Sequence, residues 1–166
     1  MRKLLVVILT MFFSSSFGFN DKEGMKVRVT KVIDGNTIEI LTDDDEVYQI
    51  MFKDVDSPEI GQNFGEEAKR FTEKLLLKKK VTVEMKGKDM WGNRLAGVTL
   101  NNGKNIEQLL IEEGLAWYNS MKSNNQKLAE VELKTKETKK GLWSESEPTP
   151  PWIFRRQQSM ATAKSR

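Results

Sequence analysis

The sequence predicts an α+β fold, a five-stranded Greek-key β-barrel with three α-helices. Two observations carry this prediction. Short runs of residues alternate apolar and polar side chains and are separated by glycine- and asparagine-rich turns, a pattern typical of strands in a closed sheet. Three longer segments repeat apolar residues at helical spacing, one of them between the third and fourth strands and two after the fifth.

The five expected strands are short and rich in β-branched residues, and they cover residues 25–33, 37–41, 47–52, 81–85 and 95–100. The first strand alternates Val27 and Val29 with charged residues, so we expect one of its faces to be buried. The turn signal D-G-N at residues 34–36 separates it from the second strand. An acidic loop over residues 42–46 then leads into the third strand.

The first expected helix covers residues 64–77 and carries its apolar residues on one face. The second begins after Asn105, a residue type preferred at the N-cap of a helix. The third covers residues 125–140, and Gly141 follows it in the C′ position, where glycine is favoured.

The N-terminal residues have the pattern of a secretory signal peptide. Arg2 and Lys3 give a positive start, residues 4–13 are apolar, and small residues end at Gly18, after which we expect cleavage. The apolar run is too short for a membrane span, although an uncleaved anchor is the alternative. We expect a secreted or periplasmic protein with no membrane contact after cleavage. Its expected parts are a signal peptide (1–18), a linker (19–24), the barrel domain (25–146) and a Pro-rich exit with a basic, disordered tail (147–166).

Histidine and cysteine are both absent from the 166 residues. Their absence excludes a Ser-His-Asp triad, a thiol nucleophile, a disulfide framework and the usual zinc sites. The net charge of +3 comes from the termini, since removing Arg2, Lys3 and the four cations of the tail from the 27 basic residues leaves 21 against 24 acidic ones. The folded body as a whole therefore lacks a strong electrostatic pull on nucleic acid.

Two carboxylates lie three residues apart at the end of the third strand. Asp56 and Glu59 flank Ser57 and Pro58, and the proline restricts the loop in which they lie. A carboxylate pair at such a strand end suits a hard-cation site and a general base. A polar turn that precedes a helix would give the same local pattern.

Seven short motifs extend this pattern along the chain. They are V-I-D-G-N-T-I (32–38), I-M-F-K-D-V-D-S-P-E (50–59), F-G-E-E-A (64–68), D-M-W-G-N-R-L-A (89–96), E-E-G-L-A-W (112–117), G-L-W (141–143) and P-P-W-I-F-R-R (150–156). In this order and spacing they resemble the staphylococcal nuclease family over nearly all of residues 25–156. The resemblance implies a five-stranded OB-fold barrel with three helices and a Ca²⁺-dependent phosphodiesterase ancestry acting on DNA and RNA.

The resemblance also assigns roles to individual residues. Asp56 and the backbone carbonyl of Ser57 would hold Ca²⁺, and Glu59 would act as the general base on the attacking water. The second aspartate of the family's first turn is Asn36 here, which weakens the expected metal site.

The two arginines with which the family clamps phosphate are missing from the matching positions. Met51 occupies the first, in the third strand, and Asn93 occupies the second, in the turn of residues 89–93. Lys53 shares the expected face of Met51, and Arg94 follows Asn93 by one residue, so each is a candidate stand-in. If residues 93 and 94 already lie on a strand, the one-residue slip turns Arg94 to the opposite face.

Asp89, Trp91, Trp117 and Tyr118 are the expected contacts with nucleic acid or another ligand. Trp91 replaces the tyrosine of the family's D-x-Y-G-R motif, and Trp117 and Tyr118 lie where the family often has aromatic residues beside the groove. Exposed rings can stack bases in a sequence-tolerant way, whereas buried rings only pack on the barrel. The sequence leaves both interpretations open for these three rings.

Three functions follow from these residues. The first is a secreted, catalytically impaired nuclease homologue, a monomer that binds DNA, RNA or another phosphate-containing ligand. The second is an active Ca²⁺-dependent endonuclease with Glu59 as base, and the third is a protein-interaction barrel with no nucleic-acid role. Met51, Asn93 and Asn36 favour the first function, because a phosphate-clamping arginine in phosphoryl transfer is typically worth about 10³–10⁵ in rate.

Overall fold

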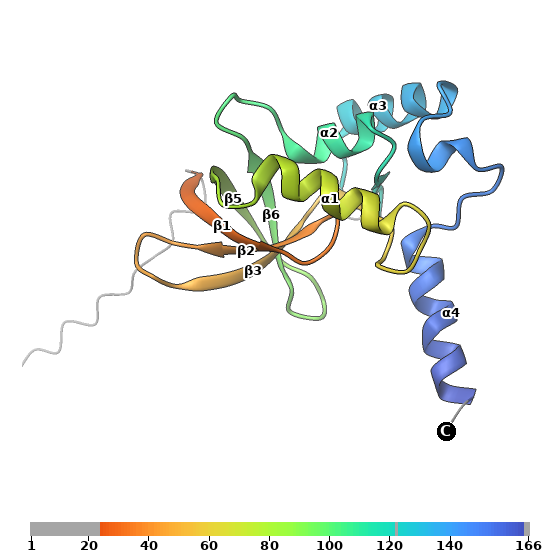
Figure 1. Ribbon diagram of the computed structural model, residues 1–166, viewed down its shortest axis with the longest axis horizontal. Helices are drawn as coiled ribbons and strands as arrows, with labels where there is room; N and C mark the ends of the chain where they lie inside the picture. The colour runs from red at the N-terminus through yellow and green to blue at the C-terminus, as the bar shows by residue number, and fades with distance from the viewer. Residues whose placement is uncertain (1–23, 122, 165–166) are drawn as a thin grey trace, which may run out of the picture.

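Figure 1 shows the computed structural model, which describes residues 24–121 and 123–164. The expected signal peptide of residues 1–18, its cleavage after Gly18 and the linker up to residue 23 lie outside the described residues. No helix in the described ranges is long and apolar enough to cross a membrane.

Five strands of the described chain form a closed barrel, as the alternating sequence predicted (Figure 1). They are β1 (Met25–Val32), β2 (Thr37–Leu41), β3 (Val47–Phe52), β5 (Lys80–Lys88) and β6 (Arg94–Thr99). The order around the barrel is β1-β2-β3-β6-β5, and β1 pairs with β5 to close it. Neighbours are antiparallel except β3 and β6, which run parallel. Together with its helices the barrel makes an α+β, OB-like fold.

In the described residues four α-helices accompany the barrel, one more than predicted: α1 (Gly65–Leu76), α2 (Ile106–Glu112), α3 (Gln126–Glu137) and α4 (Pro151–Lys164). A short 3₁₀ helix, η1 (Gly141–Ser144), lies between α3 and α4. Asn105 and Asn125 cap α2 and α3, since their side chains accept hydrogen bonds from the N–H groups of Gln108 and Leu128.

The segment expected to be a Pro-rich exit and a basic tail, disordered beyond Arg156, instead carries a helix that was not predicted, α4 at residues 151–164. Pro151 suits the first helical position, where its fixed φ angle fits and its missing N–H leaves no bond unmade. The carbonyl of Pro150 accepts hydrogen bonds from the N–H groups of Ile153 and Phe154. The helix extends away from the barrel (Figure 1), and its exposed residues gave the sequence no apolar periodicity to reveal it.

The third helix ends earlier than predicted. α3 stops at Glu137, and Lys139 follows it with a φ of 52°, so Gly141 is not the C′ residue. Glycine is required at position 141 for another reason, since its φ is 56° and a Cβ would lie 2.3 Å from the carbonyl oxygen of Gly114. The N–H of Leu142 donates to the same oxygen, which holds η1 against the segment after α2.

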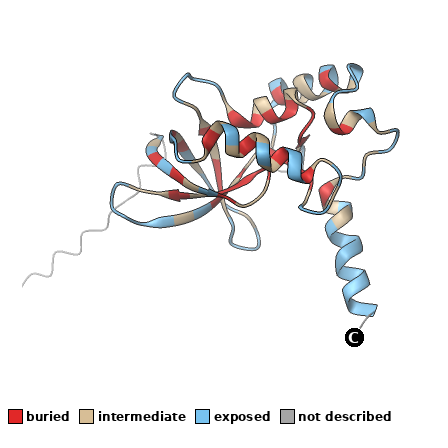
Figure 2. Ribbon diagram, viewed as in Figure 1, coloured by how far each residue is buried: buried red, intermediate tan, exposed pale blue. Residues whose placement is uncertain are grey.

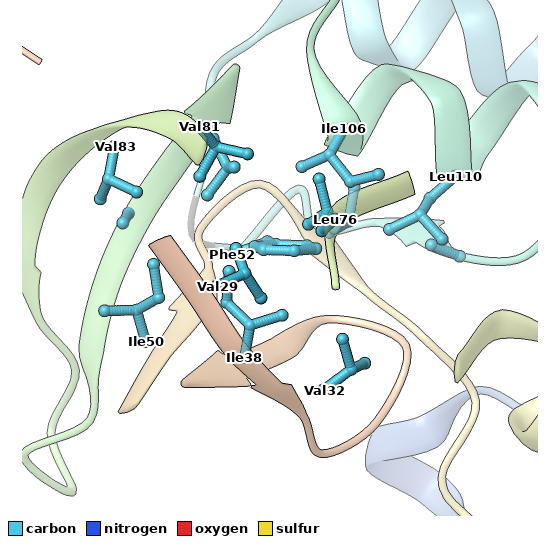
Figure 3. Close-up of a cluster of buried hydrophobic side chains, with 14 of the residues drawn as sticks. Val29, Val32, Ile38, Ile50, Phe52, Leu76, Val81, Val83, Ile106 and Leu110 are labelled. Carbon is cyan, nitrogen blue, oxygen red and sulfur yellow. The ribbon is translucent and has the colours of Figure 1, made fainter. Parts of the chain in front are cut away.

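Side chains from the barrel and the helices packed on it form one hydrophobic core (Figure 3). Ile38, Ile50 and Phe52 from β2 and β3 meet Leu76 of α1 there, and each is at most 2% exposed. Figure 2 shows the buried residues following the strands and parts of α1 and α2. Because Ile50 and Phe52 point into the core, Met51 between them points to the other side of β3.

A two-stranded sheet that the sequence analysis did not predict lies outside the barrel sheet. Strand β4 (Val55–Asp56) pairs antiparallel with β7 (Trp117–Tyr118), which places Asp56 opposite Trp117. The pairing fixes the chain between β3 and α1, where the two carboxylates of the candidate site lie.

Candidate active site

A cleft of about 570 Å³ lies beside β3, with residues of the β5–β6 hairpin and of α4 in its walls. It brings together most of the residues that the sequence analysis selected. The lining includes Asn36, Met51, Lys53, Asp56, Glu59, Asp89, Trp91, Asn93, Trp152, Arg155 and Arg156. Four selected residues do not line it, namely Ser57, Arg94, Trp117 and Tyr118.

The two predicted carboxylates lie in the same wall of this cleft. Asp56 ends β4, and its backbone is held by the pairing with β7. Glu59 lies in the following loop, where its N–H donates to the side-chain oxygen of Gln62 over 3.1 Å. Ser57 between them is buried, and its N–H donates to Oδ1 of Asn36 over 3.0 Å. The turn before β2 is thereby tied to the loop after β4.

A guanidinium group from α4 lies against both carboxylates, and the sequence alone gave it no role. Nη1 and Nη2 of Arg155 donate to Oδ1 and Oδ2 of Asp56 over 3.1 and 2.8 Å, which is a bidentate ion pair. Nη1 also donates to Oε1 of Glu59. The hydrogen bonds to Asp56, and secondarily the one to Glu59, raise the pKa of Arg155 above its ordinary value, so the group is a permanent cation.

One face of α4 forms part of the cleft wall. Trp152, Arg155, Arg156 and Ser159 all line the cleft, and their spacing of three, four and seven residues from Trp152 places them on one side of the helix. Trp152 anchors this face, since its ring packs edge-on against that of Trp117 with centroids 6.4 Å apart. The sequence held one signal for it, a proline pair followed by an aromatic residue and two arginines at helical spacing.

Met51 and Asn93 lie in the cleft wall, at the positions where the resemblance implies arginines. Met51 pairs with Thr37 of β2 and Leu95 of β6, and its thioether offers a phosphate neither charge nor an N–H donor. The amide Nδ2 of Asn93 donates to Oδ2 of Asp89 over 3.0 Å, so this side chain supports the hairpin turn. Neither residue supplies a cation to the cleft.

The two candidate stand-ins are placed differently. Lys53 lines the cleft. Arg94 is the first residue of β6, and its guanidinium lies 4.5 Å from the ring centroid of Tyr48 in a cation–π contact. Arg94 does not line the cleft and is engaged by Tyr48, so of the two only Lys53 lies in the cleft wall.

Trp91 and Asp89 lie at the tip of the β5–β6 hairpin, and both line the cleft. Trp91 is 72% exposed, so its ring offers a surface on which a base can stack. Asp89 shapes the turn, since its Oδ1 accepts hydrogen bonds from the N–H groups of Trp91 and Asn93.

The expectation that Trp117 and Tyr118 contact a ligand is corrected by their surroundings. Trp117 is only 6% exposed, because its ring packs edge-on against the rings of Trp143 and Trp152. Tyr118 is half-buried, and its hydroxyl donates to the carbonyl of Ser123 over 2.7 Å. Neither ring borders the cleft, and Trp117 instead forms the surface on which α4 docks.

The residues expected to hold Ca²⁺ do not make a calcium site as they are arranged. Both oxygens of Asp56 are paired with Arg155, and Oδ1 of Asn36 already accepts the N–H of Ser57. Calcium takes six to eight oxygen ligands. Among the described residues, no group of three or more histidine, cysteine or acidic side chains could hold a metal ion. In this arrangement the guanidinium of Arg155 lies beside Asp56, where the resemblance implies a metal ion.

Positive and negative side chains are nearly balanced around the cleft. Its lining holds the carboxylates of Asp34, Asp56, Glu59 and Asp89 and the cations Lys53, Arg155 and Arg156. Burial raises the pKa of Asp34, although a hydrogen bond from the N–H of Asn36 partly opposes this. A phosphate can therefore be held here only by individually placed donors, because the cleft has no excess of positive charge.

A buried glutamate behind the cleft supports the same loop, and the sequence analysis did not select it. Glu107 of α2 is 3% exposed. Its Oε1 accepts the N–H of Asp54 over 2.9 Å, and its Oε2 accepts Nδ2 of Asn105 over 3.2 Å. Burial raises the pKa of Glu107, although these two hydrogen bonds oppose the shift. The carboxylate thus fixes the chain between Lys53 and β4.

In Glu107→Gln, the free energy of unfolding is expected to fall less than in the parent as pH rises above about 4.5. The raised pKa means that Glu107 stabilises the fold fully below its ordinary value of 4.5, and that this contribution is lost as pH rises through the folded-state pKa. Urea unfolding at a series of pH values measures the effect. Glu130→Gln, at an exposed position on α3, is the control and should leave the pH profile unchanged. Superimposable profiles for the Glu107 variant and the parent would contradict this prediction.

The segments that form this site also fall largely within the regions in which the chain is similar to known proteins. A family model described as Staphylococcal nuclease homologue matches residues 49–145. A protein of Escherichia coli O157:H7 named "Uncharacterized endonuclease" is 33% identical over 128 residues, which cover 77% of this chain and 83% of that protein. A Haemophilus influenzae protein of the same name is 28% identical over 162 residues, covering 98% and 90%. The "Micrococcal nuclease" of Shigella flexneri is 30% identical over 144 residues, covering 81% and 82%. The family match includes β3 from residue 49 on, β4 and the β5–β6 hairpin, but ends before α4.

Proposed function

Because the chain belongs to the staphylococcal nuclease homologue family, we propose that it binds the phosphate backbone of nucleic acid in the cleft beside β3 and is impaired in hydrolysis. The observation that carries the proposal is the make-up of the cleft wall. Met51 and Asn93 stand where two phosphate-clamping arginines are expected, and Arg155 engages both Asp56 and Glu59.

The binding half of the proposal is supported by the cations and the ring that face the cleft. Lys53 lines it from the loop after β3, and Arg155 and Arg156 line it from α4. Phosphate contacts from such side chains supply most of the affinity for nucleic acid. Trp91 is exposed on the same rim, and stacking on an aromatic ring is worth about 1–3 kcal/mol per base. The near balance of charge in the cleft favours a single-stranded or nucleotide-like ligand that makes few phosphate contacts.

The size of the expected loss in rate supports the second part of the proposal, that hydrolysis is impaired. A phosphate-clamping arginine is typically worth about 10³–10⁵ in the rate of phosphoryl transfer, and the effects of two such groups do not simply multiply. Glu59 is also held by Arg155, so as a base it must first give up an ion pair. These losses are large enough to bring a fast nuclease down by about a thousandfold or more.

A working but slow endonuclease is the second candidate, and one observation favours it. Arg155 brings a guanidinium to the carboxylates from another element, where it could stabilise charge that builds up on a phosphate. In this case Glu59→Gln should abolish metal-dependent cleavage, and cleavage that survives the change would come from a contaminant.

A binding and digestion experiment on the purified protein tests the proposal. Fluorescence anisotropy with a labelled, short oligothymidylate should show binding that weakens as salt rises. Digestion of DNA and RNA with added Ca²⁺ should proceed far below the rate of an active family member measured beside it. Rapid turnover would overturn the impaired half, and the absence of salt-dependent binding would overturn the binding half.

A further inference from the structure

We infer that Arg155, carried by α4, is the residue that binds a nucleic-acid phosphate in this cleft, in place of the arginines missing at positions 51 and 93. The inference rests on the proposed function and deepens it, since it names the helix and the side chain that would hold the phosphodiester. It is carried by the placement of a guanidinium from the C-terminal helix against two carboxylates that lie 99 and 96 residues earlier in the sequence.

The guanidinium has donors left after its bonds to the protein. An arginine side chain has five N–H donors in a planar fork. The bonds to Asp56 and Glu59 use both hydrogens of Nη1 and the hydrogen of Nη2 that faces Nη1. The two remaining hydrogens, on Nε and Nη2, lie along one edge of the plane, and such an edge can pair with two oxygens of a phosphate. The side chain of Arg155 lines the cleft and is 47% exposed, so a ligand there can reach this edge.

The carboxylates also preorganise this donor edge. The side chain of Asp56 is only 9% exposed, and its bidentate pairing sets the plane of the guanidinium. A side chain already held in place loses little freedom when a ligand binds, which favours affinity. Arg156 lies one residue further along the same face of α4, and Lys53 lines the cleft from the loop after β3. These two cations offset the repulsion that Asp56 and Glu59 would exert on a bound phosphate.

The helix is docked by contacts that do not involve the guanidinium. Trp152 packs edge-on against Trp117, which is itself buried. The side-chain amide of Gln62 donates to the carbonyl of Thr149, just before the helix, and accepts the N–H of Glu59. Changing Arg155 is therefore expected to leave α4 in place, so that an effect on binding reports on the donor edge.

The same ion pairs would form if Arg155 merely blocked the carboxylates, and the two cases predict opposite results. A residue that binds phosphate lowers affinity when it is removed. A residue that blocks the site raises affinity, or exposes metal-dependent cleavage, when it is removed.

The test compares binding of the labelled oligothymidylate to the protein, Arg155→Gln and Arg155→Lys over a range of salt. We expect Arg155→Gln to weaken binding by about tenfold or more, the loss of one charge-assisted bidentate contact. Its plot of log affinity against log salt should also become shallower by about 0.7, the value for one phosphate contact on a single strand. Arg155→Lys should restore the slope but only part of the affinity, because lysine has charge without the fork. Arg70→Gln, an equal charge change at an exposed position of α1 outside the cleft, should change affinity little.

Near-ultraviolet circular dichroism of the tryptophans and thermal unfolding check that each variant keeps its fold. If the parent binds and folded Arg155→Gln binds equally well or more tightly, the inference is overturned while the proposed function stands. If Arg155→Gln does not fold, Arg155→Lys decides, since affinity and slope both equal to those of the parent would exclude a role for the fork. If the parent shows no salt-dependent binding, it is the proposed function that fails.

Discussion

Replacing Asn36 by Asp, Met51 by Arg and Asn93 by Arg together is expected to raise Ca²⁺-dependent cleavage of DNA by about a thousandfold over the parent protein. The substitutions return one carboxylate and two cations to positions that border the cleft, and Asp56 and Glu59 are already there. Met51 lies on the wall and is half-buried, so a longer side chain has room to reach into the cleft. Cleavage is measured with DNA and RNA at several Ca²⁺ concentrations.

The extra carboxylate makes a second readout available for this triple variant. The carboxylate introduced at position 36 would lie close to Asp34 and Ser57, so its charge should destabilise the protein unless a cation binds. Added Ca²⁺ should then raise the melting temperature of the triple variant more than that of the parent.

Two controls define what the gain of cleavage means. Glu59→Gln in the triple variant should remove the gained activity, because it deletes the proposed base. In a control variant, the first arginine is placed at Val47 instead of Met51. Val47 is 56% exposed on the same strand, so this variant has the same net charge but no arginine at position 51. A folded triple variant that cleaves no better than the parent or the Val47 control would show that the defect lies elsewhere.

Phe52→Ala is expected to lower the free energy of unfolding by about 3–5 kcal/mol, a large part of the roughly 5–15 kcal/mol typical of a domain. Phe52 is 2% exposed in the centre of the barrel core (Figure 3), so its truncation leaves a cavity that neighbouring side chains only partly fill. Its N–H also donates to the carbonyl of Asn36, and this bond ties β3 to the turn that borders the cleft. Urea unfolding measures the change.

The matched control for this change is Val47→Ala, which lies on the same strand at an exposed position and should cost within about 0.5 kcal/mol. The Phe52 variant should also lose affinity for the oligothymidylate at temperatures where it is still folded, because Met51, Lys53 and Asn36 move with the strand. A loss of stability no greater than that of the Val47 control would mean that Phe52 does not organise the core.

Local pattern was sufficient for most of the fold. Alternation of apolar and polar residues placed the five barrel strands, since burial of one face imposes a period of two along each strand. The asparagines before α2 and α3 marked their starts, because an N-cap forms with N–H groups only three residues away. The strand-end motif also selected Asp56 and Glu59, and short motifs elsewhere selected Met51, Asn93 and Trp91, all of which border one cleft.

Local pattern failed where burial or pairing depends on distant segments. Trp117 was a candidate ligand contact in the sequence, but the rings of Trp143 and Trp152 cover it. Glu107 has the local sequence of an ordinary polar helix residue, yet it is buried and accepts the N–H of Asp54, which lies 53 residues earlier. The residues within a helical turn of Trp117 or Glu107 do not indicate these contacts.

The sequence by itself determined that this protein has an OB-like barrel of the staphylococcal nuclease family and that its cleft lacks both clamping arginines. These properties are set by residue type and by spacing within a few positions. Only the tertiary structure decided that the C-terminal segment is helical and that it delivers Arg155 to Asp56 and Glu59. The reason is that the guanidinium and the two carboxylates lie nearly a hundred residues apart in the sequence and are brought together by tertiary packing, including that of Trp152 on Trp117.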